Sequence, residues 1–163
     1  SREELYAKSD VISLHCPLTP ENRHLVNAES IALMKDGVIL INTGRGGLID
    51  SKALVEALKS GKIRGAGLDV YEEEEQYFFE DWSLSPIRDD VLARLIQFPN
   101  VLITSHQAFL TEEALGEIAR VTLANIADWK GSGKVQNEIC YKCTDIGKAQ
   151  GCLREKTGRC WTA

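Results

Sequence analysis

Short aliphatic runs alternate with amphipathic stretches along most of this 163-residue chain, and this alternation constrains the fold more than any other feature. Four runs have the length and composition of buried strands: residues 11–15, 38–42, 65–70 and 101–104. Strands that are largely apolar, with helical stretches between them, are typical of a parallel sheet covered on both faces by helices. The sequence therefore predicts an α/β fold with four strands and right-handed crossovers.

Capping residues indicate where the first connecting helices begin and end. A short helix is expected over residues 27–34, with Gly37 as its C-terminal cap. Asp50 is a favourable N-cap for a second helix over residues 51–59, and Gly61 follows its last turn. The apolar residues of this second helix form one stripe, which predicts that the helix packs on the sheet.

Two more helices are expected in the second half of the chain. One is short and spans residues 89–97, after a loop rich in acidic and aromatic residues. The other begins after Thr111, carries Glu112 and Glu113 in its first turn, and ends at residues 131–133. Its apolar face, which is predicted to pack on a core, consists of Leu115, Ile118, Thr122, Ile126 and Trp129.

Composition and charge argue against several classes of protein. No run approaches the ~18 apolar residues of a membrane span and no secretory leader opens the chain, so we expect a cytoplasmic protein without a membrane partner. The formal net charge of -5 argues against a nucleic acid as the main partner. Cys16 is the only cysteine before residue 140, which fits a reducing compartment. Because the chain begins at Ser1 and its one methionine is Met34, we expect it to be a piece of a longer protein.

Polar residues follow the predicted strands, at the sheet edge where open α/β sheets bind their ligands. Arg45 lies in a glycine-rich turn after the second strand, Asp69 and four glutamates end or follow the third, and His106 follows the fourth. An arginine offers a planar pair of donors to a carboxylate substrate. A histidine beside a carboxylate can hold a proton near neutral pH and deliver it to a carbonyl oxygen. Together these residues favour a catalytic site over coincidence.

Each of these residues also has a purely structural interpretation. The run Glu72–Glu75, taken alone, is typical of a solvated loop. The other structural alternatives are ion pairing of Arg45 with Glu56 or Asp50, turn capping by Asp69, backbone bonding by His106 and simple burial of Cys16.

Three long stretches resemble the D-isomer-specific 2-hydroxyacid dehydrogenases. They read SDVISLHCPLTPENRHLVN, ILINTGRGGLIDSKALVEALKSGKIRGAGLDVYEEEE and NVLITSHQAFLTEEAL, and the resemblance runs from about residue 9 to residue 139. The segments HQAFLT and YFFEDWSLSPIRDD are similar to the D-lactate dehydrogenase branch of that family. The resemblance implies a Rossmann-like parallel sheet.

The resemblance also implies roles for individual residues. Arg45 matches the arginine that grips the substrate carboxylate, His106 the proton donor to the keto oxygen, and Glu74 the glutamate that bonds to that histidine. Positions that match the lining of the NAD site are Cys16, Pro17, Asn22, Thr43, Gly44, Arg45 and Asp69, with Asp69 facing the nicotinamide carboxamide. Phe109 matches a wall of the pocket around the substrate methyl group. No metal is implied.

The implied reaction is the reversible reduction of pyruvate to D-lactate by NADH in a homodimer. Protonated His106 donates to the oxygen while hydride reaches C2, and Arg45 orients the acid. Two enzymatic alternatives remain. The substrate can be another 2-oxo acid, such as phenylpyruvate or hydroxypyruvate, and the cofactor can be NADP in place of NAD. A third alternative is a non-catalytic dinucleotide-sensing module, since relatives of this fold serve as transcriptional corepressors.

The chain departs from the family pattern at its beginning. It contains no G-x-G-x-x-G turn, no acidic residue about 20 positions later to hold the ribose, and no substrate domain. The Rossmann-like sheet is therefore expected to be partial, with an unpaired edge at residues 11–15 where a first strand is missing. We expect the chain alone to bind NADH poorly and to turn over nothing.

Three segments are expected from this pattern. Residues 1–130 form the second half of an NAD-binding domain with its closing long helix, and residues 131–139 return toward the substrate domain. Residues 140–163 form a tail that is predicted to be disordered. A four-thiolate zinc site is the alternative for the tail, but only one C-x2-C pair is present among Cys140, Cys143, Cys152 and Cys160.

Overall fold

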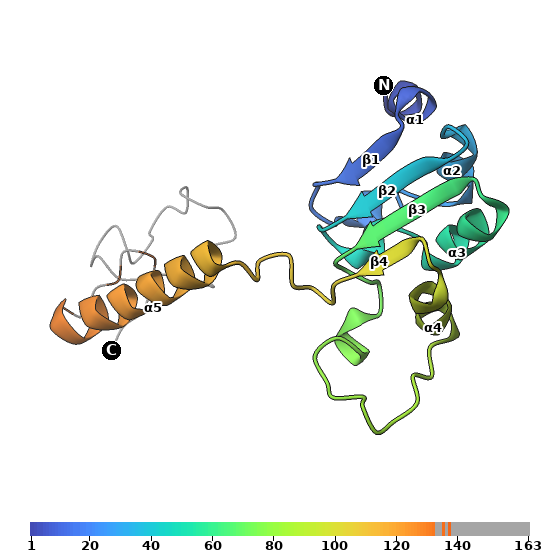
Figure 1. Ribbon diagram of the computed structural model, residues 1–163. Helices are drawn as coiled ribbons and strands as arrows, with labels where there is room; N and C mark the ends of the chain where they lie inside the picture. Colours follow the sequence, from blue (N-terminus) through green and yellow to red (C-terminus); the bar gives the residue numbers. More distant parts are fainter. Residues whose placement is uncertain (133–134, 136, 138–163) are drawn as a thin grey trace. The chain divides into compact units, whose positions relative to one another are not determined.

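The computed structural model describes residues 1–132, 135 and 137, which fall into two compact units divided after Ala108. The first unit contains one parallel sheet of four strands in the order β1-β2-β3-β4 (Figure 1). The strands are β1 (Val11–Leu14), β2 (Val38–Asn42), β3 (Ile63–Leu68) and β4 (Val101–Ile103). The predicted α/β sheet is confirmed, and each strand lies within two residues of its expected bounds.

Four helices accompany the sheet in the first unit: α1 (Arg2–Lys8), α2 (Ala28–Leu33), α3 (Ser51–Ser60) and α4 (Asp90–Gln97). The Asp50 side chain accepts hydrogen bonds from the backbone N–H groups of Lys52 and Ala53, and Gly61 ends α3 with a φ of 77°. Both caps of α3 were predicted and are confirmed. Three short 3₁₀ turns, Pro20–Asn22, Gly46–Leu48 and Glu74–Gln76, lie in the loops that follow β1, β2 and β3.

The expected C-terminal cap of α2 is wrong. This helix ends at Leu33, with Met34 as its cap in an extended conformation. Gly37 instead has a φ of 79° in the turn before β2, where its N–H bonds to the carbonyl of Lys62. A glycine with positive φ serves a helix end and a tight turn equally well, so sequence alone does not separate the two.

The sheet buries one face in the described residues, where two covered faces were expected. Inward side chains alternate with more exposed ones along each strand, and Val11 and Leu102 are 55% and 65% exposed. Each strand is added on the same side of the preceding one, so connections of one hand place every following helix on one face. The apolar core on that face includes Leu40, Leu48, Leu54, Ile63, Leu92 and Leu95.

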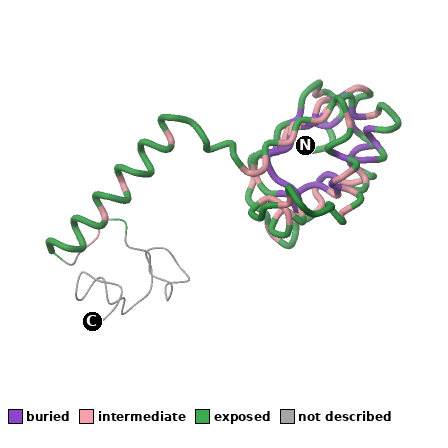
Figure 2. Tube along the Cα trace, turned by 60° about the horizontal axis from the view of Figure 1, so that its bottom comes forward, coloured by how far each residue is buried: buried purple, intermediate pink, exposed green. Residues whose placement is uncertain are grey.

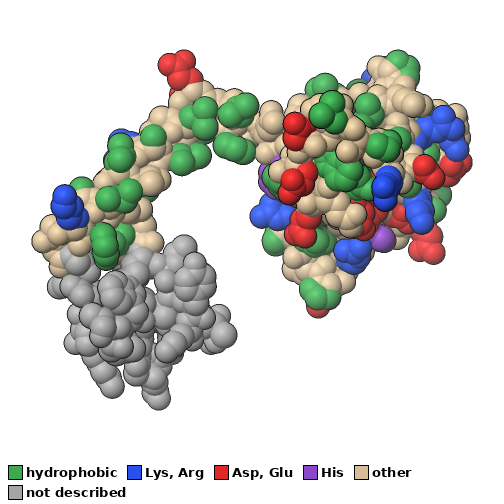
Figure 3. Space-filling model, turned by 90° about the horizontal axis from the view of Figure 1, so that it is seen from below, with side chains coloured by type: hydrophobic (Ala, Val, Ile, Leu, Met, Phe, Trp, Pro, Cys, Tyr) green, Lys and Arg blue, Asp and Glu red, His purple; other side chains and the backbone are tan. Residues whose placement is uncertain are grey.

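The second unit contains the long helix α5 (Glu112–Ser132), whose start is capped as predicted by the Thr111 hydroxyl, which accepts from the N–H of Ala114. The expected core face of α5 is not buried in the described residues (Figures 2 and 3): Leu115, Ile118, Ile126 and Trp129 are 44% to 57% exposed. Periodicity shows which face is apolar but not what covers it. None of the helices in the described part of the chain is long and apolar enough to cross a membrane.

The predicted tail, residues 140–163, lies outside the described residues, as does most of the segment 131–139.

Candidate active site

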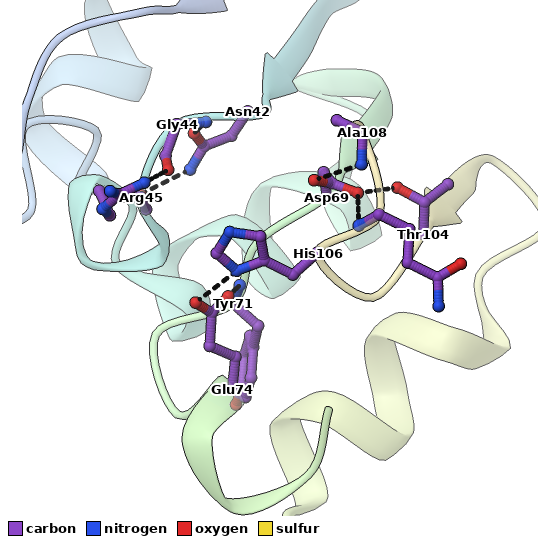
Figure 4. Close-up of polar contacts among 10 residues, drawn as sticks. Asn42, Gly44, Arg45, Asp69, Tyr71, Glu74, Thr104, His106 and Ala108 are labelled. Carbon is purple, nitrogen blue, oxygen red and sulfur yellow. Dashed lines mark hydrogen bonds and ion pairs between the residues drawn. The ribbon is translucent and has the colours of Figure 1, made fainter. Parts of the chain in front are cut away.

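The turn after β2 presents Arg45 to solvent because the buried Asn42 side chain organises it (Figure 4). The Asn42 amide donates to the carbonyl of Arg45 at 3.0 Å, and its oxygen accepts from the N–H of Gly44 at 3.1 Å. The Arg45 guanidinium is exposed and donates to the carbonyl of Gly44 at 2.7 Å. Its two expected structural partners are engaged elsewhere, since Asp50 caps α3 and Glu56 pairs with Lys59.

The glycine after Arg45 brings the arginine turn against the loop that follows β3. A Cβ added to Gly46 would lie 2.1 Å from the carbonyl carbon and oxygen of Tyr71 and 2.5 Å from the nitrogen of Glu72. The two backbones therefore touch directly, and only glycine permits this approach. The position of Arg45 is tied in this way to the loop that carries the four glutamates.

Asp69 organises the turn that carries His106. Its side chain, in a residue only 3% exposed, accepts from the hydroxyl of Thr104 and from the N–H groups of Gln107 at 2.7 Å and Ala108 at 3.0 Å. The N–H of His106 donates to the Asp69 carbonyl. These bonds support a left-handed backbone at His106, with a φ of 58°. Asp69 is thus a turn anchor, and three of about four lone-pair sites of its carboxylate are occupied.

Burial acts to raise the pKa of the Asp69 carboxyl, but the hydrogen bonds that it accepts and the nearby His106 outweigh burial and hold this pKa below its ordinary value. Asp69 is therefore ionised near neutral pH.

Glu74 holds one nitrogen of the His106 ring. The ring Nδ1 lies 2.9 Å from Glu74 Oε1, and Glu74 Oε2 accepts from the N–H of Tyr71 at 2.9 Å (Figure 4). The Glu74 side chain is 14% exposed and that of His106 is 34% exposed. With Nδ1–H donating to the carboxylate, Nε2 is the atom that can exchange a proton with a ligand.

The glutamate run does not behave uniformly as a solvated loop. Glu72 and Glu74 are half-buried with charged or polar partners, whereas Glu73 and Glu75 are exposed. The resemblance singled out Glu74 among the four, and the structure brings that residue to His106.

An aromatic residue beside His106 was missed by the sequence reasoning. The ring of Phe79 lies 6.0 Å from the His106 ring at an interplanar angle of 49°, although Phe79 is 63% exposed. Its neighbour Phe78 packs toward the core beside Tyr71, with ring centroids 6.3 Å apart. Phe79 lies in an irregular loop, where no periodicity indicates which side chains face a site.

The residues predicted after β1 lie together in one loop. The Asn22 amide donates to the carbonyl of Pro17 at 2.7 Å and lies 4.0 Å from the Cys16 sulfur. Cys16 is partly buried against the core. Thr43 is exposed at the end of β2, next to Gly44. Phe109 belongs to the second unit, where it is 51% exposed.

The described residues contain no group of three or more histidine, cysteine, aspartate or glutamate side chains placed to hold a metal ion. The cysteines of the proposed zinc alternative all lie outside those residues.

The exposed arginine and the carboxylate-held histidine lie at the carboxyl edge of a parallel α/β sheet, where open sheets of this class bind nucleotides and other ligands. The comparison with family models agrees: residues 1–108 match the NAD-binding domain of the D-isomer specific 2-hydroxyacid dehydrogenases. The chain belongs to this family, and NAD is the cofactor of the family's domain.

Individual relatives support the same assignment. A 2-hydroxyacid dehydrogenase homolog of Haemophilus influenzae is 60% identical over 137 residues, 84% of this chain and 41% of its own length. The D-lactate dehydrogenase of Escherichia coli is 54% identical over 135 residues, 83% of this chain and 41% of its own length. A solved pyruvate reductase of Chlamydomonas reinhardtii is 52% identical with a TM-score of 0.73, covering 78% of this chain and 39% of its own. The chain thus spans about two fifths of the length of the relatives it matches.

Proposed function

We propose that this chain is the carboxyl-terminal part of an NAD-dependent D-lactate dehydrogenase, which interconverts pyruvate and D-lactate. The observation that carries the proposal is the Glu74–His106 pair, with its 2.9 Å contact, at the same sheet edge as the exposed Arg45. The 54% identity to the Escherichia coli D-lactate dehydrogenase supports pyruvate as the substrate.

Arg45 binds the substrate carboxylate in this proposal. One of its terminal nitrogens bonds to the Gly44 carbonyl, and the guanidinium keeps further N–H donors for a ligand. A planar pair of donors matches the geometry of a carboxylate and orients the neighbouring 2-oxo group.

His106 is the acid in pyruvate reduction and the base in lactate oxidation. The Glu74 carboxylate stabilises the protonated ring through Nδ1, and Nε2 gives its proton to the substrate oxygen as that oxygen gains negative charge. In the reverse direction Nε2 accepts the hydroxyl proton. Glu74 thus orients the ring in both directions of the reaction while it keeps its own contact with the Tyr71 N–H.

The polar groups at the sheet edge fit one end of the cofactor. The nicotinamide riboside of NADH is uncharged. Most of the residues that would hold it are small or neutral, namely Cys16, Pro17, Asn22, Thr43 and Gly44. The two charged residues of this set are Arg45 and Asp69. When bound, NADH supplies the hydride for C2 of the substrate. The sequence contains no G-x-G-x-x-G turn to bind the pyrophosphate of NADH, so in this proposal the pyrophosphate is bound by residues outside this chain.

The whole enzyme is, in this proposal, a cytoplasmic homodimer without nucleic-acid or membrane partners. This chain alone is expected to show no turnover, because it lacks the phosphate-binding turn and the substrate domain.

The test is a chimera in which residues 1–132 replace the segment they match in the Escherichia coli enzyme, assayed for NADH-dependent reduction of pyruvate, phenylpyruvate and hydroxypyruvate. We expect pyruvate to have the highest kcat/KM. Arg45→Met and His106→Gln should each lower kcat/KM by roughly 100-fold or more, and the exposed controls Arg64→Met and His15→Gln should leave it unchanged. Activity that survives His106→Gln, or a chimera that folds and reduces none of the three acids, would contradict the proposal.

A further inference from the structure

The carboxylate of Glu72 joins three separate segments of the first unit. Its Oε2 lies 2.7 Å from the Nε2 of His24 and 3.6 Å from the guanidinium of Arg23, both in the loop after β1. Its Oε1 accepts from the N–H of Ser51, the first residue of α3, at 3.2 Å. The Glu72 side chain is only 14% exposed.

The backbone around His24 follows the chain that leads from Arg45 into α3. The N–H of His24 bonds to the carbonyl of Gly47 at 2.8 Å, and the N–H of Val26 bonds to that of Leu48 at 2.9 Å. His24 has a φ of 53°, a left-handed conformation that turns its side chain toward Glu72 at some conformational cost. The loops after β1 and β2 therefore form one layer, to which Glu72 binds.

Glu72 also stands between the two halves of the proposed catalytic site. On one side, its own N–H and the Tyr71 carbonyl contact Gly46, the residue after Arg45. On the other side, the Tyr71 N–H holds Glu74, which holds His106. A displacement of residues 71 and 72 would therefore displace both Arg45 and His106.

We propose that Glu72 is a positioning residue, which clamps the loop that carries Glu74 onto the loops that carry Arg45 and Asn22. This proposal rests on the function proposed above. The Glu72 carboxylate is suited to this positioning role because it contacts two cationic or protonatable side chains and the N-terminus of the ten-residue helix α3. A negative charge is favoured at a helix N-terminus. Glu73, next in the chain, is exposed, and its carboxylate accepts from the side-chain amide of Gln76 at 3.4 Å.

The first test measures amide hydrogen exchange by NMR in the full chain, with Glu72→Ala, Glu72→Gln and the control Glu73→Ala. Glu72→Ala removes both acceptors, so exchange at Ser51 and Tyr71 should accelerate by roughly tenfold or more, while Leu40 in the central strand changes less. Glu72→Gln keeps an oxygen for Ser51 and an amide for His24, so it should restore most of the protection. Glu73→Ala should leave all three amides unchanged.

The second test measures kinetics in the chimera. Since misplacement by about 1 Å can cost up to 100-fold in rate, Glu72→Ala should lower kcat/KM for pyruvate by roughly 10- to 100-fold, with Glu72→Gln restoring most of it and Glu73→Ala having no effect. His24→Ala, which removes one partner only, should give an intermediate loss and serves if Glu72→Ala does not fold.

The outcomes separate the two proposals. Unchanged exchange at Ser51 and Tyr71 in Glu72→Ala, or unchanged kcat/KM in an active chimera, overturns the positioning role. Equal acceleration at Leu40 also overturns it, because the residue would then stabilise the fold as a whole. If the unsubstituted chimera folds and is inactive, the proposed function fails, while amide exchange in the full chain still decides whether Glu72 clamps the loops.

Discussion

Replacing Gly46 with alanine tests whether the arginine turn and the glutamate loop share one close backbone contact. The new Cβ would meet the carbonyl carbon and oxygen of Tyr71 at 2.1 Å, whereas ordinary contacts begin near 3.4 Å. The two loops must therefore separate by roughly 1 Å, and no side chain can rotate away to relieve the overlap.

The matched control is Gly44→Ala, on the other side of Arg45. There the new Cβ would lie 3.4 Å from the Leu14 carbonyl oxygen and 3.5 Å from Asn42 Oδ1, which is ordinary contact. Both variants reduce the freedom of the unfolded chain by the same amount, so their difference isolates the native contact.

We expect Gly46→Ala to lower the free energy of unfolding by about 3 kcal/mol, the upper end of the usual cost of overpacking. For a unit of this size that corresponds to a decrease in Tm of roughly 12–24 °C. Gly44→Ala should change stability by less than about 1 kcal/mol.

The assay is urea unfolding of the full chain, followed by circular dichroism, with the midpoint and slope compared among the three proteins. Equal stability of Gly46→Ala and the unsubstituted chain would refute the close contact. Equal destabilisation by Gly44→Ala would show that the whole turn, and not the approach to Tyr71, is sensitive.

Three further predictions concern the carboxylates and Tyr71. Asp69→Asn should destabilise the first unit by about 3 kcal/mol, because the amide repels one of the N–H donors of Gln107 and Ala108. Folding lowers the pKa of Asp69, so the stability that its carboxylate contributes should be complete above the unfolded pKa of about 3.9 and should decline as the pH falls through the folded pKa. Urea midpoints of the two proteins, measured from pH 7 to pH 3, should therefore converge. Glu74→Gln should lower kcat/KM of the chimera for pyruvate by roughly 10-fold or more, because the ring loses the carboxylate that orients Nε2 toward the substrate, and an unchanged kcat/KM would contradict the role of Glu74. Tyr71→Phe should lower the free energy of unfolding by about 1–2 kcal/mol, measured by thermal unfolding, because the buried hydroxyl donates to Asp89 at 2.7 Å. Burial, together with this bond, raises the pKa of Tyr71. An unchanged Tm would show that the bond contributes nothing to stability.

Local signals in the sequence predicted the elements of the first unit well. The strands are short aliphatic runs, and Asp50 and Gly61 act within one turn of α3, so their effect is readable from neighbouring residues. Helix α1 was missed, because only Tyr6 of its seven residues is buried and no apolar stripe marks it.

Contacts between residues that lie far apart in the sequence were harder to predict. Glu72 meets His24 across 48 positions, and Asp69 meets Thr104 across 35, so no spacing rule connects them. The convergence of Arg45, Glu74 and His106 on one edge was predictable only because parallel strands end on the same side. The choice of Glu74 over its neighbours came from family resemblance and not from the residues themselves.

In the proposed site, Glu74 holds Nδ1–H of His106 and leaves Nε2 to exchange the proton. The chain has three histidines, so long-range ¹H–¹⁵N NMR of the full chain, with His15→Gln and His24→Gln to assign the signals, reports the tautomer of each ring. We predict that neutral His106 carries its proton on Nδ1 and that Glu74→Ala, which removes the acceptor, abolishes this preference. A neutral ring protonated on Nε2 in the unsubstituted chain would contradict the proposed contact between Nδ1–H and Glu74.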